Sequence, residues 1–343
     1  MTRVFIYEFV TGGGWWGVDP GHPPAGSLRK EAIAMVRALA HDFSVLPSVQ
    51  VASLCDARLA NVFPAAVDVS LVTSSEQERR AWYQAASEAD CCVIIAPEFD
   101  GHLLSRVGWA EELNCRLLSP HSAYVAVAAD KHLTAQTLIR SGFAAPRGIR
   151  WQHGEPIPAW LQWTVVLKPC DGAGSQNVRL VRTARELAAM KLISNSESNP
   201  RPMRLEEYCP GLAASVAMLC GPGGNQVLPA GRQLLSSDGH FRYVGGEMPL
   251  TPELCRRATQ LAHSVANALP TTTGYVGIDV VLGDKPDGSL DFVIEINPRL
   301  TTSYVGLREI CRENLAAAML AVASGEMVPL SFDSRVIRFA VEK

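Results

Sequence analysis

Two apolar runs near the C-terminus each carry one carboxylate. Asp279 lies in the run at residues 274–282, and Glu295 lies with Asn297 in the run at residues 292–299. Side chains alternate between the faces of a strand, so in a hairpin all three can point the same way. Buried carboxylates are costly without a cationic partner, and the oxygens of these side chains suit Mg²⁺. The runs therefore predict a hairpin with a metal site, and the alternative is an acidic strand edge that faces water.

Composition narrows the class of protein. The chain has 343 residues, of which 48% are hydrophobic and 19% charged, so it can bury a core large enough for two or three domains. A net charge of −3 without a Lys/Arg tract argues against nucleic acid and anionic membranes as partners. No apolar run reaches the roughly 20 residues of a membrane span, and residues 1–10 lack the features of a signal peptide. We expect a cytoplasmic protein.

The first 125 residues predict an α/β domain with a parallel sheet. The predicted strands span residues 3–10, 67–72 and 91–96. One predicted helix begins at a capping Ser27, and another spans residues 76–88. Short strands that alternate with helices are typical of parallel sheets covered by helices. Ligands in such sheets bind beyond the carboxyl ends of the strands, which directs attention to residues 8–14 and 97–101.

Residues 12–17 match the G-x-G-x-x-G fingerprint of dinucleotide-binding proteins directly after a predicted strand. The fingerprint requires a helix that begins at the glycines, whereas prolines follow and delay the helix to about Ser27. We reject the dinucleotide interpretation. Two alternatives stay open for Trp15 and Trp16: a lid over a ligand, or packing on the sheet.

Two lysines are placed where phosphate groups could explain them. Asp130 predicts the N-cap of a helix at residues 131–141, with Gly142 at its C-terminal end. Lys131 in the first turn is unfavourable for the helix dipole unless an anion binds there, although an exposed lysine is an equal alternative. Lys168 closes an apolar strand, which favours a function for it over a surface position.

A glycine-rich segment follows Lys168 and precedes a further strand. Gly172 and Gly174 would let backbone amides approach phosphate oxygens, and Ser175 would add a hydroxyl. The segment is not a Walker P-loop, because it lacks the G-x-x-x-x-G-K-[ST] pattern and leads into a strand. A hairpin that folds over a triphosphate is the predicted role.

The order of these parts, with the connector Glu206-Glu207-Tyr208-Cys209-Pro210-Gly211 between them, resembles the ATP-grasp superfamily over about residues 130–310. The resemblance implies an α/β and α+β fold, in which a Rossmann-like pre-ATP-grasp domain at residues 1–125 precedes two α+β subdomains that clasp ATP, at residues 126–203 and 204–343. It implies ATP and Mg²⁺, or Mn²⁺ in its place, as cofactors. Lys131 and Lys168 would bind the phosphates, and Asp279, Glu295 and Asn297 the metal.

The same resemblance assigns the adenine to Glu206 and to the backbone of Glu207 and Cys209. One position departs from the pattern: many relatives have a ribose-binding glutamate two residues after the connector glycine, and this chain has Ala213 there. Recognition of the ribose must therefore differ or be weaker.

Enzymes of this superfamily join a carboxylate to an amine through an acyl phosphate, which implies an ADP-forming ligase that acts on small molecules. Arg299 and Arg232 are the candidate catalytic residues, since a guanidinium can stabilise the transferring phosphoryl group or hold the acid. For Arg232 a surface position is an equal alternative. The sequence leaves a homodimer open.

The segments around residues 5–14, 96–98 and 295–304 resemble the tyramine–L-glutamate ligases of methanofuran biosynthesis, which belong to the one-carbon metabolism of methanogens and methylotrophs. That resemblance implies activation of the γ-carboxyl of L-glutamate and attack by tyramine. The candidate substrate contacts are Glu8 and Glu98 for an ammonium, Ser303 for a carboxylate or phosphate, and Tyr304 for a phenol ring. Two rivals remain: another ATP-grasp amino-acid or dipeptide ligase, and a nucleotide-binding module without ligase activity.

Overall fold

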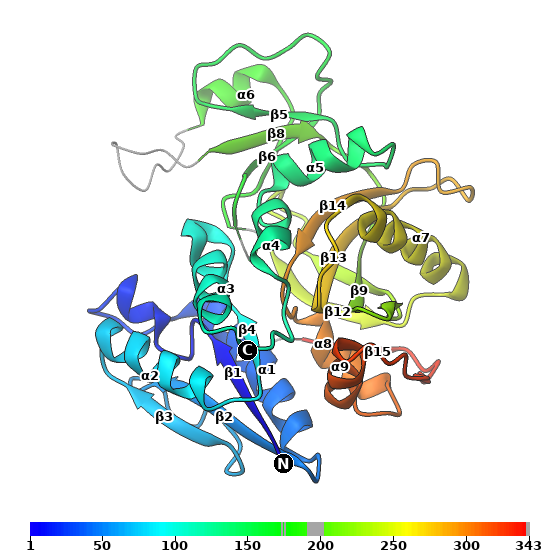
Figure 1. Ribbon diagram of the computed structural model, residues 1–343. Helices are drawn as coiled ribbons and strands as arrows, with labels where there is room; N and C mark the ends of the chain where they lie inside the picture. Colours follow the sequence, from blue (N-terminus) through cyan, green and yellow to red (C-terminus); the bar gives the residue numbers. More distant parts are fainter. Residues whose placement is uncertain (173, 175, 191–201, 341–343) are drawn as a thin grey trace.

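The computed structural model describes residues 1–172, 174, 176–190 and 202–340. Ser175, to which the sequence assigned a phosphate contact, lies outside the described residues. In the described part, the chain forms one parallel sheet followed by two antiparallel sheets (Figure 1).

The N-terminal sheet has the strand order β3-β2-β1-β4, and its neighbouring strands are parallel. Its elements are β1 (Thr2–Glu8), the 3-10 helix η1 (Gly14–Gly17), α1 (Gly26–Ser44), β2 (Val49–Asp56), β3 (Asp68–Val72), α2 (Ser75–Ser87), β4 (Cys91–Ile95), η2 (Phe99–Gly101), α3 (His102–Glu112) and α4 (Ser122–Ala128). The predicted α/β architecture is confirmed. The sequence analysis missed β2, in which Gln50 and Ser53 interrupt the apolar pattern.

The start of α1 differs from the prediction in one detail. Ser27 does not cap the helix, because α1 begins at Gly26 and its N-cap residue is Ala25, which makes no side-chain hydrogen bond. As predicted, the α-helix begins well after the glycines at residues 12–17. The chain therefore lacks the α-helix that a dinucleotide fingerprint requires directly at its glycines. Trp16 instead donates its indole N–H to the carbonyl of Val72 at 3.3 Å, and Arg58 stacks on its ring, so packing on the sheet is the outcome for this residue.

The second sheet is antiparallel, with the order β5-β8-β6-β7. Its elements are α5 (Lys131–Arg140), β5 (Gly148–Trp151), β6 (Val165–Pro169), β7 (Arg179–Val181), α6 (Ala184–Ala189) and β8 (Met203–Glu207). The predicted cap of α5 is confirmed, since the Asp130 carboxylate accepts from the backbone N–H groups of His132 and Leu133. Gly142 has φ +80°, the left-handed conformation that a side chain disfavours.

The third sheet carries the predicted hairpin. Its strand order is β14-β13-β9-β11-β12-β15, and β10 pairs with β9. The elements are β9 (Leu212–Gly221), β10 (Gly224–Val227), β11 (Gly231–Leu235), β12 (Tyr243–Met248), α7 (Pro252–Ala268), β13 (Gly274–Leu282), β14 (Phe292–Asn297), α8 (Ser303–Ile310), α9 (Leu315–Ala323) and β15 (Ile337–Phe339). β13 and β14 are antiparallel, and Asp279 lies directly opposite Glu295.

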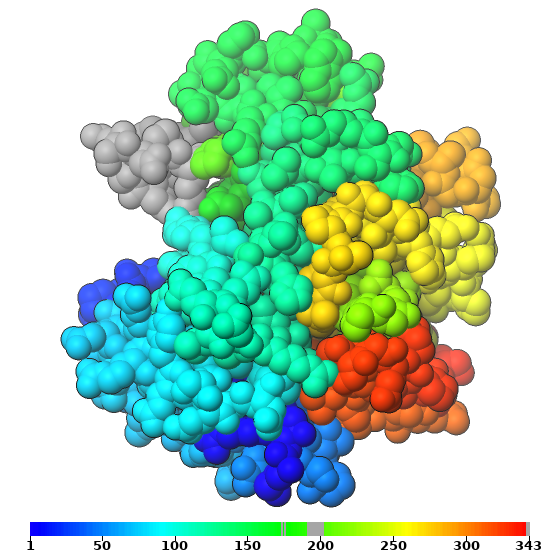
Figure 2. Space-filling view, viewed as in Figure 1, coloured from blue at the N-terminus to red at the C-terminus, as the bar shows by residue number. Residues whose placement is uncertain are grey.

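Helix α1 joins the N-terminal sheet to the C-terminal part. One hydrophobic core includes Met35 and Leu39 of α1 together with Leu307 of α8 and Met319 of α9. Beside this core, the Asp42 carboxylate accepts hydrogen bonds from Arg308 and from Tyr304. The space-filling view shows the resulting contact between the blue N-terminal and the orange-red C-terminal residues (Figure 2).

The two antiparallel sheets also contact each other at a hairpin tip. The backbone N–H of Leu180 in β7 donates to the carbonyl of Gly239, between β11 and β12, at 2.8 Å. The space between the sheets is therefore bounded on this side. Among the described residues, no helix has the length and apolar character to cross a membrane.

Candidate active site

A cavity of about 400 Å³ lies between the two antiparallel sheets. Residues of β6 and β8 line one wall, residues of β9 and β11–β14 line the other, and α1 contributes Glu31 and Met35 at one end. The N-terminal domain and both antiparallel sheets therefore contribute residues to this cavity.

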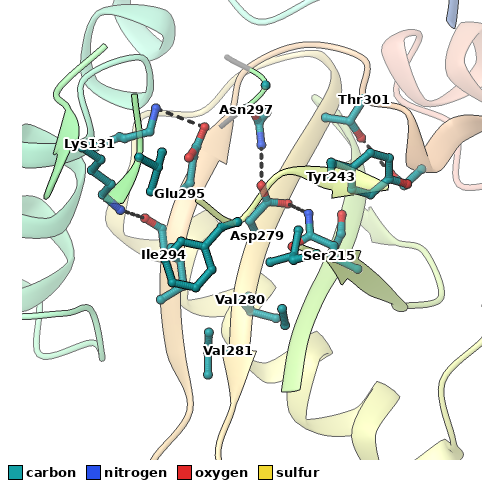
Figure 3. Close-up of a pocket in the computed structure, with 18 of the residues that line it drawn as sticks. Lys131, Ser215, Tyr243, Asp279, Val280, Val281, Ile294, Glu295, Asn297 and Thr301 are labelled. Carbon is teal, nitrogen blue, oxygen red and sulfur yellow. Dashed lines mark hydrogen bonds and ion pairs between the residues drawn. The ribbon is translucent and has the colours of Figure 1, made fainter. Parts of the chain in front are cut away.

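The carboxylate pair faces the cavity from the hairpin of β13 and β14 (Figure 3). Asp279 accepts a hydrogen bond from the Gln233 amide at 2.9 Å and from the Asn297 amide at 3.3 Å. Glu295 forms an ion pair with Lys131, with 3.1 Å between Oε1 and Nζ. The structure thus brings together the three residues to which the sequence assigned a metal.

Two neighbouring acids share a single cation here. Burial, followed by the charge of Glu295, raises the pKa of Asp279 well above its usual range. No cluster of three His, Cys, Asp or Glu side chains occurs among the described residues, so a metal would use the two carboxylates and the amide oxygen of Asn297. These hard oxygen donors, with a net negative charge, fit a Mg²⁺ ion.

Lys131 lies at the N-terminus of α5 and is 7% exposed. Its ammonium also donates to the carbonyl of Gly172 at 2.9 Å. Burial lowers its pKa, but Glu295 and then Glu98 outweigh this effect and raise the pKa above its usual value. An anion therefore does offset this cation at the positive end of the helix dipole, and in the structure that anion is a carboxylate of the protein.

Lys168 belongs to a second, positively charged cluster. Its Nζ lies 2.5 Å from Oε1 of Glu206, and the other oxygen of Glu206 accepts from Nε of Arg204, also at 2.5 Å. All three residues are at most 3% exposed. Since cations hold both of its oxygens, Glu206 fixes Lys168 in place and does not fit the predicted contact with an adenine edge.

The connector also lines the cavity. Glu207, Tyr208 and Cys209 line it, together with Ala213. The N–H of Glu207 is already donated to the carbonyl of Arg147 at 2.9 Å, and its carbonyl accepts from the thiol of Cys209 at 3.8 Å. Gly172 and Gly174 line the cavity near Lys168.

Arg299 lines the same cavity as the carboxylate pair. Its Nε and Nη2 donate to the two oxygens of Glu98 at 2.9 and 3.1 Å, and its Nη1 donates to the carbonyl of Leu300. A guanidinium has five N–H groups, so two remain for a ligand in the cavity. Glu98 does not line the cavity and is paired, so the prediction that it binds a substrate ammonium is wrong.

The predicted contact of Glu8 is also wrong. Its carboxylate is 2% exposed and accepts from the backbone N–H and the hydroxyl of Thr11 at 2.6 and 2.7 Å. Burial raises its pKa to about 7, and the hydrogen bonds from Thr11 oppose the rise. The side chain stabilises the loop after β1 and does not line the cavity.

Three further candidates occupy different environments. Arg232 lines the cavity, has a side chain that is 51% exposed, and lies 3.8 Å from Glu247. Ser303 lines the cavity and contacts the hydroxyl of Tyr275 at 2.9 Å. Tyr304 is fully buried against Asp42, so its predicted stacking on a phenol is wrong.

Gln233, Tyr243 and Glu31 are among the cavity residues that were not predicted from the sequence. Gln233 bonds Asp279, Tyr243 adds a phenol from β12, and Glu31 adds a carboxylate from α1. Glu31 could have been found, because it precedes Met35 by four residues and so shares the buried side of the helix.

The comparisons with known proteins agree with this architecture. Residues 128–303 match the model of an ATP-grasp domain. The chain belongs to the ATP-grasp family of ADP-forming ligases. Residues 49–127 match the pre ATP-grasp 3 domain, which covers most of the parallel sheet of this ATP-grasp protein.

Curated relatives are similar at low identity. Tyramine–L-glutamate ligase of Methanocaldococcus fervens is 24% identical over 256 residues, 74% of this chain and 72% of that protein. Tyramine–L-glutamate ligase of Methanocaldococcus jannaschii is 29% identical over 139 residues, 40% of this chain and 41% of that protein.

Solved structures share the ATP-grasp fold. L-amino acid ligase from Bacillus licheniformis has a TM-score of 0.69 and 18% identity, with coverage of 95% of this chain and 76% of that chain. The biotin carboxylase domain of 2-oxoglutarate carboxylase from Hydrogenobacter thermophilus, in a complex with MgADP, has a TM-score of 0.70 and 15% identity, with coverage of 95% and 70%.

Proposed function

We propose that the protein is an ATP- and Mg²⁺-dependent ligase that joins the γ-carboxyl of L-glutamate to tyramine, as a step of methanofuran-type cofactor biosynthesis. The observation that carries the ligase assignment is the division of charge along one cavity. Lys168 and Arg204 exceed Glu206 by one positive charge, whereas Asp279 and Glu295 exceed Lys131 by one negative charge. The similarity to two tyramine–L-glutamate ligases supports the substrate pair.

The two clusters suit the two charges of a metal–nucleotide complex. Lys168 and the backbone near Gly172 and Gly174 would bind phosphate oxygens, and the carbonyl of Glu207 with the backbone of Cys209 would bind the adenine. Asp279, Glu295 and Asn297 would hold Mg²⁺, which when bound neutralises charge on the phosphates. Lys131 would exchange its contact with Glu295 for a phosphate.

The reaction balances without further groups. A carboxylate oxygen of the acid attacks the γ-phosphorus of ATP, ADP leaves, and an acyl phosphate forms. The amine enters as an ammonium and loses one proton to water. Its nitrogen then attacks the acyl carbon, phosphate leaves, and the departing phosphate takes up the second proton of the nitrogen. Arg299 lies beside the metal ligands and can donate two N–H groups to the anionic acyl phosphate, while Arg232 can hold the second carboxylate of glutamate.

The test is incubation of the purified protein with ATP, Mg²⁺, L-glutamate and tyramine, followed by mass spectrometry of the products. We expect γ-glutamyltyramine in an amount equal to the ADP released, with fragment ions that distinguish the γ- from the α-amide. The Asp279→Asn protein is the matched control and should form neither product above background. A product from another acid and amine would retain the ligase class and reject this substrate pair. Steady ATP binding without ADP release for every pair would reject the ligase and favour a nucleotide-binding module.

A further inference from the structure

Glu31 is a carboxylate at the α1 end of the cavity to which the family resemblance assigns no role. It is half-buried on α1, the helix of the N-terminal domain that packs against the C-terminal core. No hydrogen-bond donor contacts it among the described residues, and the guanidinium of Arg299 and the phenol of Tyr243 are the charged or titratable groups that influence it from other elements. Burial raises its pKa, and Arg299 opposes that rise.

Each of the other acids of the site contacts at least one donor of the chain. Asp279 accepts from two amides, Glu295 pairs with Lys131, Glu206 with Lys168, and Glu98 with Arg299. A partly desolvated carboxylate that lacks such a partner favours a cationic ligand. Arg299 cannot fully serve, because Glu98 already holds two of its nitrogen atoms.

Part of the cavity lining is apolar. Met35, one helical turn along α1, Met248 of β12 and Phe339 of β15 line the same cavity and belong to one hydrophobic core. A ligand with one ammonium and a hydrocarbon body matches this combination. An amino acid fits less well, because its carboxylate would lie against apolar groups and close to Glu31.

We propose that Glu31 binds the ammonium of the amine substrate and that Met35, Met248 and Phe339 contact its hydrocarbon part. The assignment rests on the proposed function and extends it to the substrate class, an arylalkyl amine without an acidic group. Glu31 is a specificity-determining residue for the amine, whereas Arg299 and Arg232 face the acid. The N-terminal domain thereby contributes one substrate contact to the cavity of the ATP-grasp domain.

Two measurements on the same proteins separate this assignment from the proposed function. Calorimetry measures binding of tyramine, phenethylamine and β-alanine to the wild-type, Glu31→Gln, Glu31→Asp and Glu309→Gln proteins in MgADP. Glu309 is an exposed acid on α8 and provides the matched control. Hydroxylamine trapping then measures acyl phosphate formation from ATP and L-glutamate, which needs no bound arylalkyl amine.

We expect Glu31→Gln to weaken tyramine and phenethylamine binding at least about tenfold, as expected for loss of one charge-assisted hydrogen bond. Glu31→Asp should recover part of this loss, Glu309→Gln should match the wild type, and β-alanine should bind poorly to each. Hydroxamate formation should be equal in all four proteins. Tyramine binding that is absent, or unchanged in Glu31→Gln, overturns the role of Glu31. Equal loss of tyramine binding and hydroxamate formation also overturns it, since the effect is then structural. Absence of hydroxamate in the wild type rejects the proposed acid, and the calorimetry still decides on Glu31.

Discussion

Buried acids occur both in the N-terminal domain and in the cavity, and the chain neutralises their charge to different extents. Glu78 accepts from the Tyr7 hydroxyl at 2.6 Å and from Arg106 at 3.1 Å, so one acid meets one cation and a neutral donor. In the cavity, Asp279 and Glu295 share Lys131. The first arrangement is complete in itself and stabilises the fold, whereas the second leaves negative charge for a ligand to neutralise. Buried charge therefore indicates a site only where the protein leaves it unbalanced.

The largest contrast should come from Asp279→Asn. We expect kcat to fall by about 1,000-fold, the upper range for loss of one charge-stabilising group in an active site. The free energy of unfolding should change by no more than about 1 kcal/mol, because the lost hydrogen bond is offset by relief of repulsion from Glu295. Steady-state kinetics with urea unfolding checks both values. A large loss of stability would place Asp279 with the structural acids.

The matched substitution in the N-terminal domain is Glu78→Gln on helix α2. It leaves the Arg106 guanidinium buried without a charge partner, so we expect the free energy of unfolding to fall by about 3–5 kcal/mol. The kcat of the folded protein should stay within about twofold of wild type, because Glu78 does not line the cavity. Loss of activity without loss of stability would show that Glu78 does not serve mainly to stabilise the fold.

Glu8 provides a pH-dependent version of the same contrast. Its pKa rises from the usual 4.5 to about 7, so the folded state binds more protons than the unfolded state between these values. Stability should therefore fall as the pH rises through this window, by up to about 3 kcal/mol at pH 8. In Glu8→Gln this part of the pH dependence should vanish, as urea unfolding at pH 5 and pH 8 would measure. Parallel pH profiles for the two proteins would contradict the assignment.

The smallest effect should come from Arg232→Gln. Its side chain is half exposed and its distance to Glu247 is 3.8 Å, so we expect less than about 0.5 kcal/mol of lost stability. The kcat/KM for the acid should fall by about tenfold if the guanidinium holds the second carboxylate of glutamate. An unchanged kcat/KM would return Arg232 to the surface position that the sequence left open.

Local sequence patterns were enough to predict the elements whose signals are local. The Asp130 cap and Gly142 bound α5, and alternation along two strands put Asp279 opposite Glu295. Both depend on neighbours within one helix or one hairpin, where spacing determines which side chains meet.

Pairs between distant segments could not be predicted in the same way. Glu98 and Arg299 are 201 residues apart, and Tyr304 meets Asp42 across 262 residues. Each of these side chains could also bind a substrate. The packing of α1 against α8 shows that Tyr304 and Asp42 instead contact each other and stabilise the fold. Glu206 has one partner of each kind. Arg204 lies two residues before it on β8, whereas Lys168 lies on the neighbouring strand β6, whose register with β8 the sequence does not specify.

Calorimetric titration of ADP into the wild-type and Asp279→Asn proteins, with and without Mg²⁺, tests the division of charge most directly. We expect Mg²⁺ to strengthen ADP binding to the wild type by about tenfold or more and to have little effect on the variant. Binding without Mg²⁺ should be similar in the two proteins or tighter in the variant, because Lys168 and the glycine-rich segment are intact. Wild-type affinity that is independent of Mg²⁺, or equal enhancement by Mg²⁺ in both proteins, would contradict the assignment of Asp279 and Glu295 to the metal.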